Sequence, residues 1–320
     1  MKNLFVLLLF PLLTWSQSYV GRVGTIPIHF KIYADQDEDQ PSKGRVDGYY
    51  FYNSKLINIP LRGVFNKEQF TIVDGYHYFE DTFEESDEVF RLKKVENQLV
   101  GSVTIKKKRY KVTLTETAED PIEDFRNPKL TFIRDSISVY NDKQLVWLHE
   151  KYSNQKLFRL GNGFTSQQRA VFNPILDNLH LENAITGLDC NSWFEIGHTV
   201  NLVSTKYVSF TQHYSVYCGG AHPSHGAVSY NFDLNTLTNL DDIETLYPNL
   251  DFFKLLKEKY YDPEDEFQQE CEVFTYEANW DYKQWNLTSE GVELTPSYPH
   301  AMTPCEESYF LSYKELLEKE

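Results

Sequence analysis

Three histidines, His213, His222 and His225, lie close together in the sequence and are the first candidates for chemistry. Three imidazoles can hold a zinc ion, and a bound zinc ion can activate water for hydrolysis. Such a site would make the chain a metal-dependent hydrolase of envelope glycans or peptides. The spacing His-x-x-His in a loop is a weak signal for this, and spacing identifies no carboxylate that would act as the general base.

A glycine-rich corner surrounds the second of these histidines. It runs from Tyr217 through Gly219, Gly220 and Ala221 to His222. Consecutive glycines after the end of a strand suit a tight reversal or a backbone with positive φ. His222 could then hydrogen-bond to carbonyl groups of the turn, which is a structural role. Loops held by a rigid sheet also carry binding or catalytic groups, so both interpretations of this corner stay open.

Two strands, at 193–202 and 206–217, are expected to hold this corner in place, with a turn near Ser204. Apolar side chains alternate along the second strand, which indicates that one of its faces is buried. His213 lies on the opposite phase and should point to solvent. His198 shares the phase of its apolar neighbours and should be a hydrogen-bonded core histidine.

The first 18 residues are typical of a signal peptide. Lys2 precedes an apolar stretch at 4–13, which is too short to span a membrane. Small residues after this stretch occupy the positions that a signal peptidase reads. The mature chain is therefore expected to start near Gln17 or Tyr19 and to be periplasmic or secreted. No later segment is long and apolar enough to span a bilayer, and no cysteine follows the leader to carry a lipid anchor.

The chain has four cysteines, Cys190, Cys218, Cys271 and Cys305. In an exported protein an even number of cysteines usually means disulfides, and four allow three pairings. A hairpin that turns near Ser204 brings Cys190 and Cys218 opposite one another, at a separation that a disulfide can bridge. We therefore predict the pairs Cys190–Cys218 and Cys271–Cys305. A zinc site is the competing interpretation, but no C-x-x-C spacing occurs.

The chain divides into two parts of different character. Residues 19–117 alternate polar and apolar side chains between turn signals, which predicts an antiparallel β meander or a barrel. The polar segment 118–129 contains two prolines and is the expected linker. Residues 130–320 mix strands with helical patterns, so we expect an antiparallel sheet flanked by helices. The predicted fold class is α+β.

Three helices are expected in the second part, the last of them in the tail after a short strand at 309–311. The first should begin at Asn173, since asparagine caps helices and Pro174 suits the first helical position. Its apolar stripe would contain Ile175, Leu176 and Leu179. The second should begin after Asn249, where apolar residues recur at helical spacing.

Several motifs follow one another in a fixed order in the second part. They are Tyr217-Cys218-Gly219-Gly220-Ala221-His222, then Tyr230-Asn231-Phe232-Asp233, then Leu240-Asp241-Asp242. This order resembles the extracytoplasmic domain of RsiV-type anti-sigma factors, which is also found beside peptidoglycan deacetylase domains of the PdaC type. The resemblance covers roughly residues 130–317. The N-terminal part is similar to the β-rich module that precedes this domain in exported proteins of the Bacteroidetes type.

The resemblance implies a recognition role, because the best-understood branch of the family binds lysozyme as an inducing ligand. It makes Tyr217, Gly219, Gly220, Ala221, His222, Asn231 and Asp233 the candidate binding residues. Signalling to a sigma factor is not carried over, since the sequence shows neither a transmembrane helix nor a sigma-binding part. The metal-binding Asp and His motifs of a polysaccharide deacetylase domain are also missing.

The charge composition further restricts the classes of partner that the chain can bind. Asp and Glu number 47 against 31 Lys and Arg, which gives a net charge of −16. Duplex nucleic acid and anionic membranes are therefore excluded as partners, because binding to phosphates depends on Lys and Arg. Electrostatic steering favours a basic protein instead. We expect a non-enzymatic, exported module that binds a protein or envelope ligand and needs no cofactor.

Overall fold

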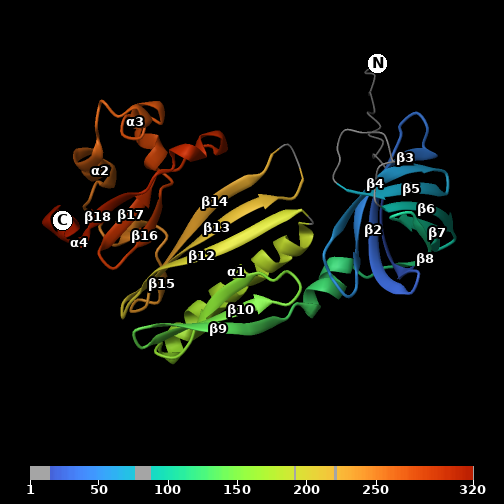
Figure 1. Ribbon diagram of the computed structural model, residues 1–320, viewed down its shortest axis with the longest axis horizontal. Helices are drawn as coiled ribbons and strands as arrows, with labels where there is room; N and C mark the ends of the chain where they lie inside the picture. The colour runs from blue at the N-terminus through green and yellow to red at the C-terminus, as the bar shows by residue number, and fades with distance from the viewer. Residues whose placement is uncertain (1–14, 76–87, 191, 220–221, 320) are drawn as a thin grey trace, which may run out of the picture.

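The structure is a computed structural model that describes residues 15–75, 88–190, 192–219 and 222–319. A β-barrel forms one end of an elongated molecule, and a small sheet with short helices forms the other (Figure 1). Between them lies a layer of longer strands packed on helix α1. The predicted α+β class, with an antiparallel barrel before the mixed part, is confirmed.

The barrel consists of eight antiparallel strands in sequence order, closed by the pairing of the first strand with the last. Its strands are β1 (Trp15–Val23), β2 (Ile26–Gln36), β3 (Lys43–Tyr52), β4 (Ile59–Asn66), β5 (Gln69–Asp74), β6 (Glu88–Val95), β7 (Gln98–Ile105) and β8 (Lys108–Thr117). Alternate side chains, among them Tyr19, Phe30 and Phe90, are fully buried and fill the interior. At the closing seam a Cβ on Gly21 would lie 2.1 Å from the carbonyl oxygen of Thr113, so glycine permits the two strands to meet.

Strand β1 begins inside the segment 1–18, whose sequence predicts a leader. Trp15 packs edge-on against Phe65 and Phe70, at ring-centroid distances of 6.4 and 6.5 Å. The pairing of β1 with β8 begins only at Ser18. A mature chain that started at Gln17 would therefore keep the whole seam. The apolar stretch 4–13 lies outside the described residues.

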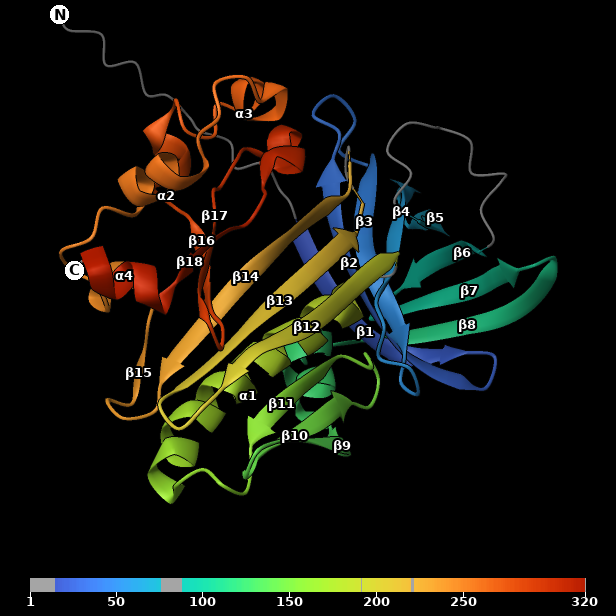
Figure 2. The ribbon, with the colours of Figure 1, turned by 60° about the vertical axis from the view of Figure 1, so that its left-hand side comes forward.

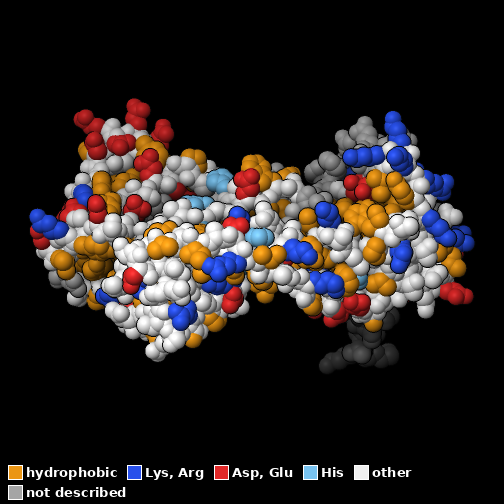
Figure 3. All heavy atoms as spheres, turned by 60° about the horizontal axis from the view of Figure 1, so that its bottom comes forward, with side chains coloured by type: hydrophobic (Ala, Val, Ile, Leu, Met, Phe, Trp, Pro, Cys, Tyr) orange, Lys and Arg blue, Asp and Glu red, His pale blue; other side chains and the backbone are white. Residues whose placement is uncertain are grey.

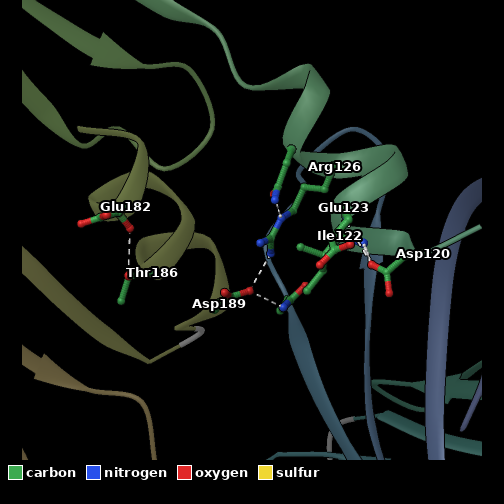
Figure 4. A network of polar contacts seen from close by, with 9 residues as sticks. Asp120, Ile122, Glu123, Arg126, Glu182, Thr186 and Asp189 are labelled. Carbon is green, nitrogen blue, oxygen red and sulfur yellow. Dashed lines mark hydrogen bonds and ion pairs between the residues drawn. The ribbon is translucent and has the colours of Figure 1, made fainter. Parts of the chain in front are cut away.

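The expected linker folds into two short helical turns, η1 (Pro121–Arg126) and η2 (Asn127–Lys129). Asp120 caps the first turn by accepting hydrogen bonds from the backbone N–H groups of Ile122 and Glu123. Arg126 at its end is fully buried and donates to Asp189 at 2.7 Å (Figure 4). Asp189 also accepts from the side chain of Asn58 in the barrel, at 2.6 Å. One carboxylate thus connects the barrel, the linker and α1.

The middle layer is built on α1 (Ser166–Asp189), which begins seven residues earlier than predicted. Thr165 and Gln168 form a capping box there, whereas Asn173 uses its side chain to bond the backbone of Leu160. Pro174 therefore lies inside the helix, not at its first position. The buried stripe also differs from the prediction, since it contains Phe172, Leu176 and His180 while Ile175 is 39% exposed.

Two antiparallel sheets complete this layer and pack with α1 around one apolar core. Their strands are β9 (Phe132–Tyr140), β10 (Lys143–Glu150) and β11 (Lys156–Leu160), then β12 (Trp193–Val203), β13 (Tyr207–Tyr217), β14 (Ser224–Asp233) and β15 (Thr238–Asn239). Phe158, Phe172 and Phe210 meet in this core and are fully buried. Helix α1 and the first sheet therefore cover one face of the sheet β12–β14 (Figure 2).

The C-terminal end is a three-stranded sheet surrounded by short helices. Its elements are η3 (Ile243–Thr245), α2 (Phe252–Tyr260), α3 (Glu266–Glu270), η4 (Glu277–Trp280), β16 (Gln284–Leu287), β17 (Gly291–Thr295), η5 (His300–Cys305), β18 (Tyr309–Ser312) and α4 (Tyr313–Lys319). Helix α2 begins where the sequence predicts. No helix in the described part of the chain is long and apolar enough to cross a membrane.

Both predicted disulfides are confirmed. Cys190 and Cys218 lie with their Cα atoms 4.8 Å apart, and those of Cys271 and Cys305 are 5.5 Å apart. The first bond joins the end of α1 to the end of β13, beside the glycine-rich corner. The second joins the region after α3 to η5.

Candidate functional site

The sheet β12–β14 has one apolar and one polar face, as expected from the period of two in a strand. Phe210, Tyr230 and Phe232 point toward α1 and belong to the apolar core or its border. On the other face, Thr211 pairs in register with Thr199 on one side and Ser229 on the other. This polar face is the starting point of the candidate site.

Strand β16 crosses one end of the polar face and is fixed there by side-chain amides. The side-chain oxygen of Asn286 accepts hydrogen bonds from Asn201 at 2.8 Å and from Thr211 at 2.9 Å. The side chain of Gln284 accepts from the backbone N–H of Ser229 at 3.0 Å. These bonds hold the C-terminal sheet at a defined position on the face.

A groove of about 680 Å³ lies between this polar face, β16–β17 and η5. Its size falls in the usual range of ligand sites. Hydroxyl and amide side chains dominate its lining: Thr199, Asn201, Thr211, Ser229, Gln284 and Asn286. Glu293 and Glu306 add acidic groups, and no lysine or arginine is among the described residues that line it.

Histidines also gather at the groove, but not in the combination predicted. The His300 ring lies 5.0 Å from that of His222 and 5.3 Å from that of His225. Its Nε2 lies 2.8 Å from the carbonyl oxygen of Pro223 and donates to it. The His213 ring lies 3.2 Å from the hydroxyl of Thr199, on the same sheet face as His225. The structure thus brings His222 and His225 together through His300.

The predicted zinc triad of His213, His222 and His225 is not assembled. Within the described ranges, no group of three or more His, Cys, Asp or Glu side chains is arranged to hold a metal ion. His213 is exposed, as the strand alternation predicts. His300 could not be connected with the other histidines from the sequence, because it lies far along the chain in η5 and no periodic pattern relates it to β14.

The glycine-rich corner has the backbone that the sequence predicts at its first glycine. Gly219 has φ of 102°, a conformation that side chains with a Cβ rarely adopt. Gly220 and Ala221 lie outside the described residues. His222 is exposed and its Nδ1 is 3.3 Å from the carbonyl oxygen of Pro223. Tyr217 is 36% exposed on the polar face.

Asn231 and Asp233, the remaining candidates, make structural contacts. Asn231 is buried, accepts from the hydroxyl of Ser209 at 2.7 Å and donates to the carbonyl oxygen of Trp285 at 2.9 Å. It therefore joins β14 to β16. Asp233 accepts from two backbone N–H groups of the following turn and shapes it. Neither residue lines the groove.

Two further histidines, His198 and His180, lie in the core beneath the polar face. His198 is within 3.0 Å of the side-chain oxygen of Gln212, as expected for a satisfied core histidine. Burial lowers its pKa to about 4. His180 on α1 is fully buried, donates to the carbonyl oxygen of Gln155 at 2.8 Å, and has its pKa lowered by burial to about 4. Both rings are therefore neutral at physiological pH.

Charge is distributed unevenly over the molecule. Residues 241–320 contain 20 Asp and Glu but only 6 Lys and Arg. Acidic side chains gather over the C-terminal end in Figure 3, whereas lysines and arginines gather over the barrel. Because β16, β17 and η5 form one wall of the groove, the groove borders the acidic end of the molecule.

Comparison with models of known protein families finds no match, and no curated protein matches the sequence. Two similar solved structures are described as members of the DUF3298 family. One, from Pseudomonas aeruginosa PAO1, has 13% identity and a TM-score of 0.32, over 59% of this chain and 92% of that chain. The other, from Bacteroides fragilis, has 13% identity and a TM-score of 0.32, over 60% of this chain and 93% of that chain.

Proposed function

We propose that the chain is an exported, non-catalytic recognition module that binds a cell-envelope or extracellular partner through the polar groove. The groove between the sheet β12–β14 and η5 carries this proposal. Its walls are fixed by amide hydrogen bonds and by the disulfide at Cys305, and its lining offers donors and acceptors to a ligand. A rigid scaffold of this kind reduces the entropic cost of binding.

Export is supported by two independent features. The first 18 residues are typical of a signal peptide. All four cysteines are paired in disulfides, and such bonds persist in oxidising compartments outside the cytosol.

If the partner is a protein, the charge distribution favours a basic one. The acidic excess of residues 241–320 borders the groove and would raise the encounter rate with a cationic surface. The resemblance to the RsiV-type domain makes lysozyme the first candidate. A metal-dependent hydrolase, the alternative, would need a metal site that the described histidines do not form.

The proposal is tested by comparing ligand binding by the wild-type chain with binding by a groove variant. The mature chain is immobilised and exposed to lysozyme, to other extracellular proteins and to envelope fragments at low and at high salt. His213→Ala removes an exposed groove side chain, and Val139→Ala, at a position 61% exposed on β9, is the matched control. We expect binding that weakens about fivefold or more in His213→Ala and not in Val139→Ala, a change of about 1 kcal/mol.

The salt dependence separates the kinds of partner. A basic protein should bind more weakly as salt rises, because salt screens the attraction. The proposal is wrong if nothing binds at micromolar concentration and low ionic strength, or if everything that binds is retained equally by His213→Ala.

A further inference from the structure

The polar face of the sheet continues beyond the groove and ends in two exposed aromatic rings. Trp193 on β12 and Tyr217 on β13 are partners in register, and they are 52% and 36% exposed. Both lie next to the disulfide Cys190–Cys218, which fixes the end of the sheet. In Figure 1 the C-terminal strands β16–β18 lie toward the opposite end of this sheet, near β15.

A polar track extends from the groove to the aromatic pair, and its first two residues on β13, Thr211 and His213, also line the groove. Thr211, His213, Ser215 and Tyr217 occupy alternate positions of β13 and share one face, which spans about 20 Å at the usual rise per residue. Gly197 is the register partner of His213, and a Cβ placed on it would meet nothing within 4 Å. The absence of a side chain there leaves a shallow space in the middle of the track.

The charges around the track select against anions. Glu195 is exposed on the same face, and Glu293 and Glu306 line the groove. No lysine or arginine is among the described residues lining the groove. Phosphorylated, sulfated or uronic ligands would therefore be repelled by these carboxylates, with no lysine or arginine in the described groove lining to attract them. A wholly apolar ligand would leave the hydroxyl and amide groups without partners, which costs free energy.

A neutral sugar chain satisfies both conditions. Its hydroxyl groups donate and accept, as do the threonine, serine, asparagine and glutamine side chains of this face. Its ring faces carry C–H groups that pack on the electron-rich faces of aromatic rings. The exposed rings of Trp193 and Tyr217 provide such faces at one end, and the hydroxyl and amide groups of the groove lie at the other.

We propose that the face running from Trp193 and Tyr217 past His213 into the groove binds a neutral oligosaccharide. This inference rests on the proposed function, because it names the chemical class of ligand that the same groove receives. The aromatic pair holds one end of the sugar chain by stacking, and the groove holds the other by hydrogen bonds.

The test is a titration of the mature chain with the neutral hexasaccharides cellohexaose and hexa-N-acetylchitohexaose, with oligogalacturonate as the anionic comparison. Calorimetry gives the Kd, and tryptophan fluorescence reports on ring burial at the exposed Trp193. We expect a neutral hexasaccharide to bind with a Kd of about 1 mM or tighter. Trp193→Ala should weaken it about tenfold, and Trp193→Phe, which keeps a ring, by less than about threefold.

Two controls keep the test decisive. Tyr282→Ala removes a ring that is 82% exposed elsewhere and should leave the Kd unchanged. His213→Ala tests the track without touching the residues near the disulfide, in case Trp193→Ala disturbs folding. Absence of binding by both neutral sugars, equal binding by Trp193→Ala, or tighter binding of oligogalacturonate would overturn the inference. If a protein partner binds through the groove while no sugar binds, the inference fails and the proposed function stands; if neither binds, both fail.

Discussion

Two histidines, the half-buried His198 and the fully buried His180, set the pH response of the middle layer. His198 donates toward Gln212, whose side chain also bonds to Asn183 on α1. The Nε2 of His180 donates to the backbone carbonyl oxygen of Gln155. Each ring is neutral in the fold because burial holds its pKa at about 4. The unfolded chain keeps the ordinary histidine pKa of about 6.5.

The free energy of unfolding should therefore depend on pH in a defined direction. Between pH 6.5 and 4 the unfolded chain binds protons that the folded chain does not, so stability is complete above pH 6.5 and falls as the pH drops toward 4. In His198→Gln, which can keep a donor near Gln212 but does not titrate, this fall should be smaller by about 2 kcal/mol. Urea unfolding of both proteins at a series of pH values measures it. Equal slopes in the two proteins would contradict the account.

At the scale of elements, the disulfides fix the two parts that carry the candidate site. Cys190–Cys218 spans 28 residues and joins α1 to β13, and Cys271–Cys305 spans 34 residues and holds η5. A disulfide that closes a loop of this length lowers the conformational entropy of the unfolded chain and so stabilises the fold. Strand β13 and η5, each next to one of these disulfides, both contribute side chains to the groove.

Removing the first disulfide should lower stability markedly. The double variant Cys190→Ala, Cys218→Ala should lose about 3–4 kcal/mol of unfolding free energy, in line with the entropy of closing its loop. Chemical denaturation of this variant beside the wild type, with thiol titration of the unfolded wild type as the control, checks it. Free thiols in the wild type, or a loss of unfolding free energy below about 1 kcal/mol in the variant, would contradict a stabilising role of this disulfide.

The elements were predictable from the sequence where a local pattern decides them. Alternation indicated the barrel strands and the exposure of His213, and the symmetry of the hairpin about Ser204 gave the disulfide pairing. The start of α1 was not predictable from Asn173 and Pro174, because the capping box at Thr165 and burial of Phe172 extend the helix upstream. Tertiary packing overrode local propensity there.

The groove itself was not predictable, since its walls come from segments far apart in the sequence. Asn286 reaches Thr211 across 75 residues, and His300 reaches Pro223 across 77. Neither contact leaves a periodic or spacing signal. Of the candidate residues, Asn231 matters through its bonds to Ser209 and Trp285, which position β16. The resemblance makes Asn231 a candidate binding residue, whereas its contacts in the structure are structural.

At the scale of the whole molecule, Asp189 joins the barrel to the mixed part. Its carboxylate accepts from the fully buried Arg126 and from Asn58. Asp189→Ala would leave the guanidinium buried without its ion pair, which usually costs about 3–5 kcal/mol. The side chain of Asp189 is 43% exposed, so we expect a smaller loss of about 2–3 kcal/mol.

Limited proteolysis and urea unfolding of Asp189→Ala measure this loss. Cleavage within residues 118–129 should accelerate, because the buried end of η1 loses its anchor. Glu123→Ala, an exposed change in the same turn, should have little effect and is the matched control. Unchanged proteolysis and unfolding of Asp189→Ala would show that other contacts hold the barrel in place.

The central claim is that the polar face of β12–β14 and its groove form the ligand-binding surface. Hydrogen–deuterium exchange of the mature chain, with and without its bound partner or oligosaccharide, tests this most directly. The account predicts slower exchange in peptides covering 193–217, 224–231 and 284–306, with the barrel at 15–75 and 88–117 unchanged. Protection confined to the barrel, with none in these three segments, would contradict it.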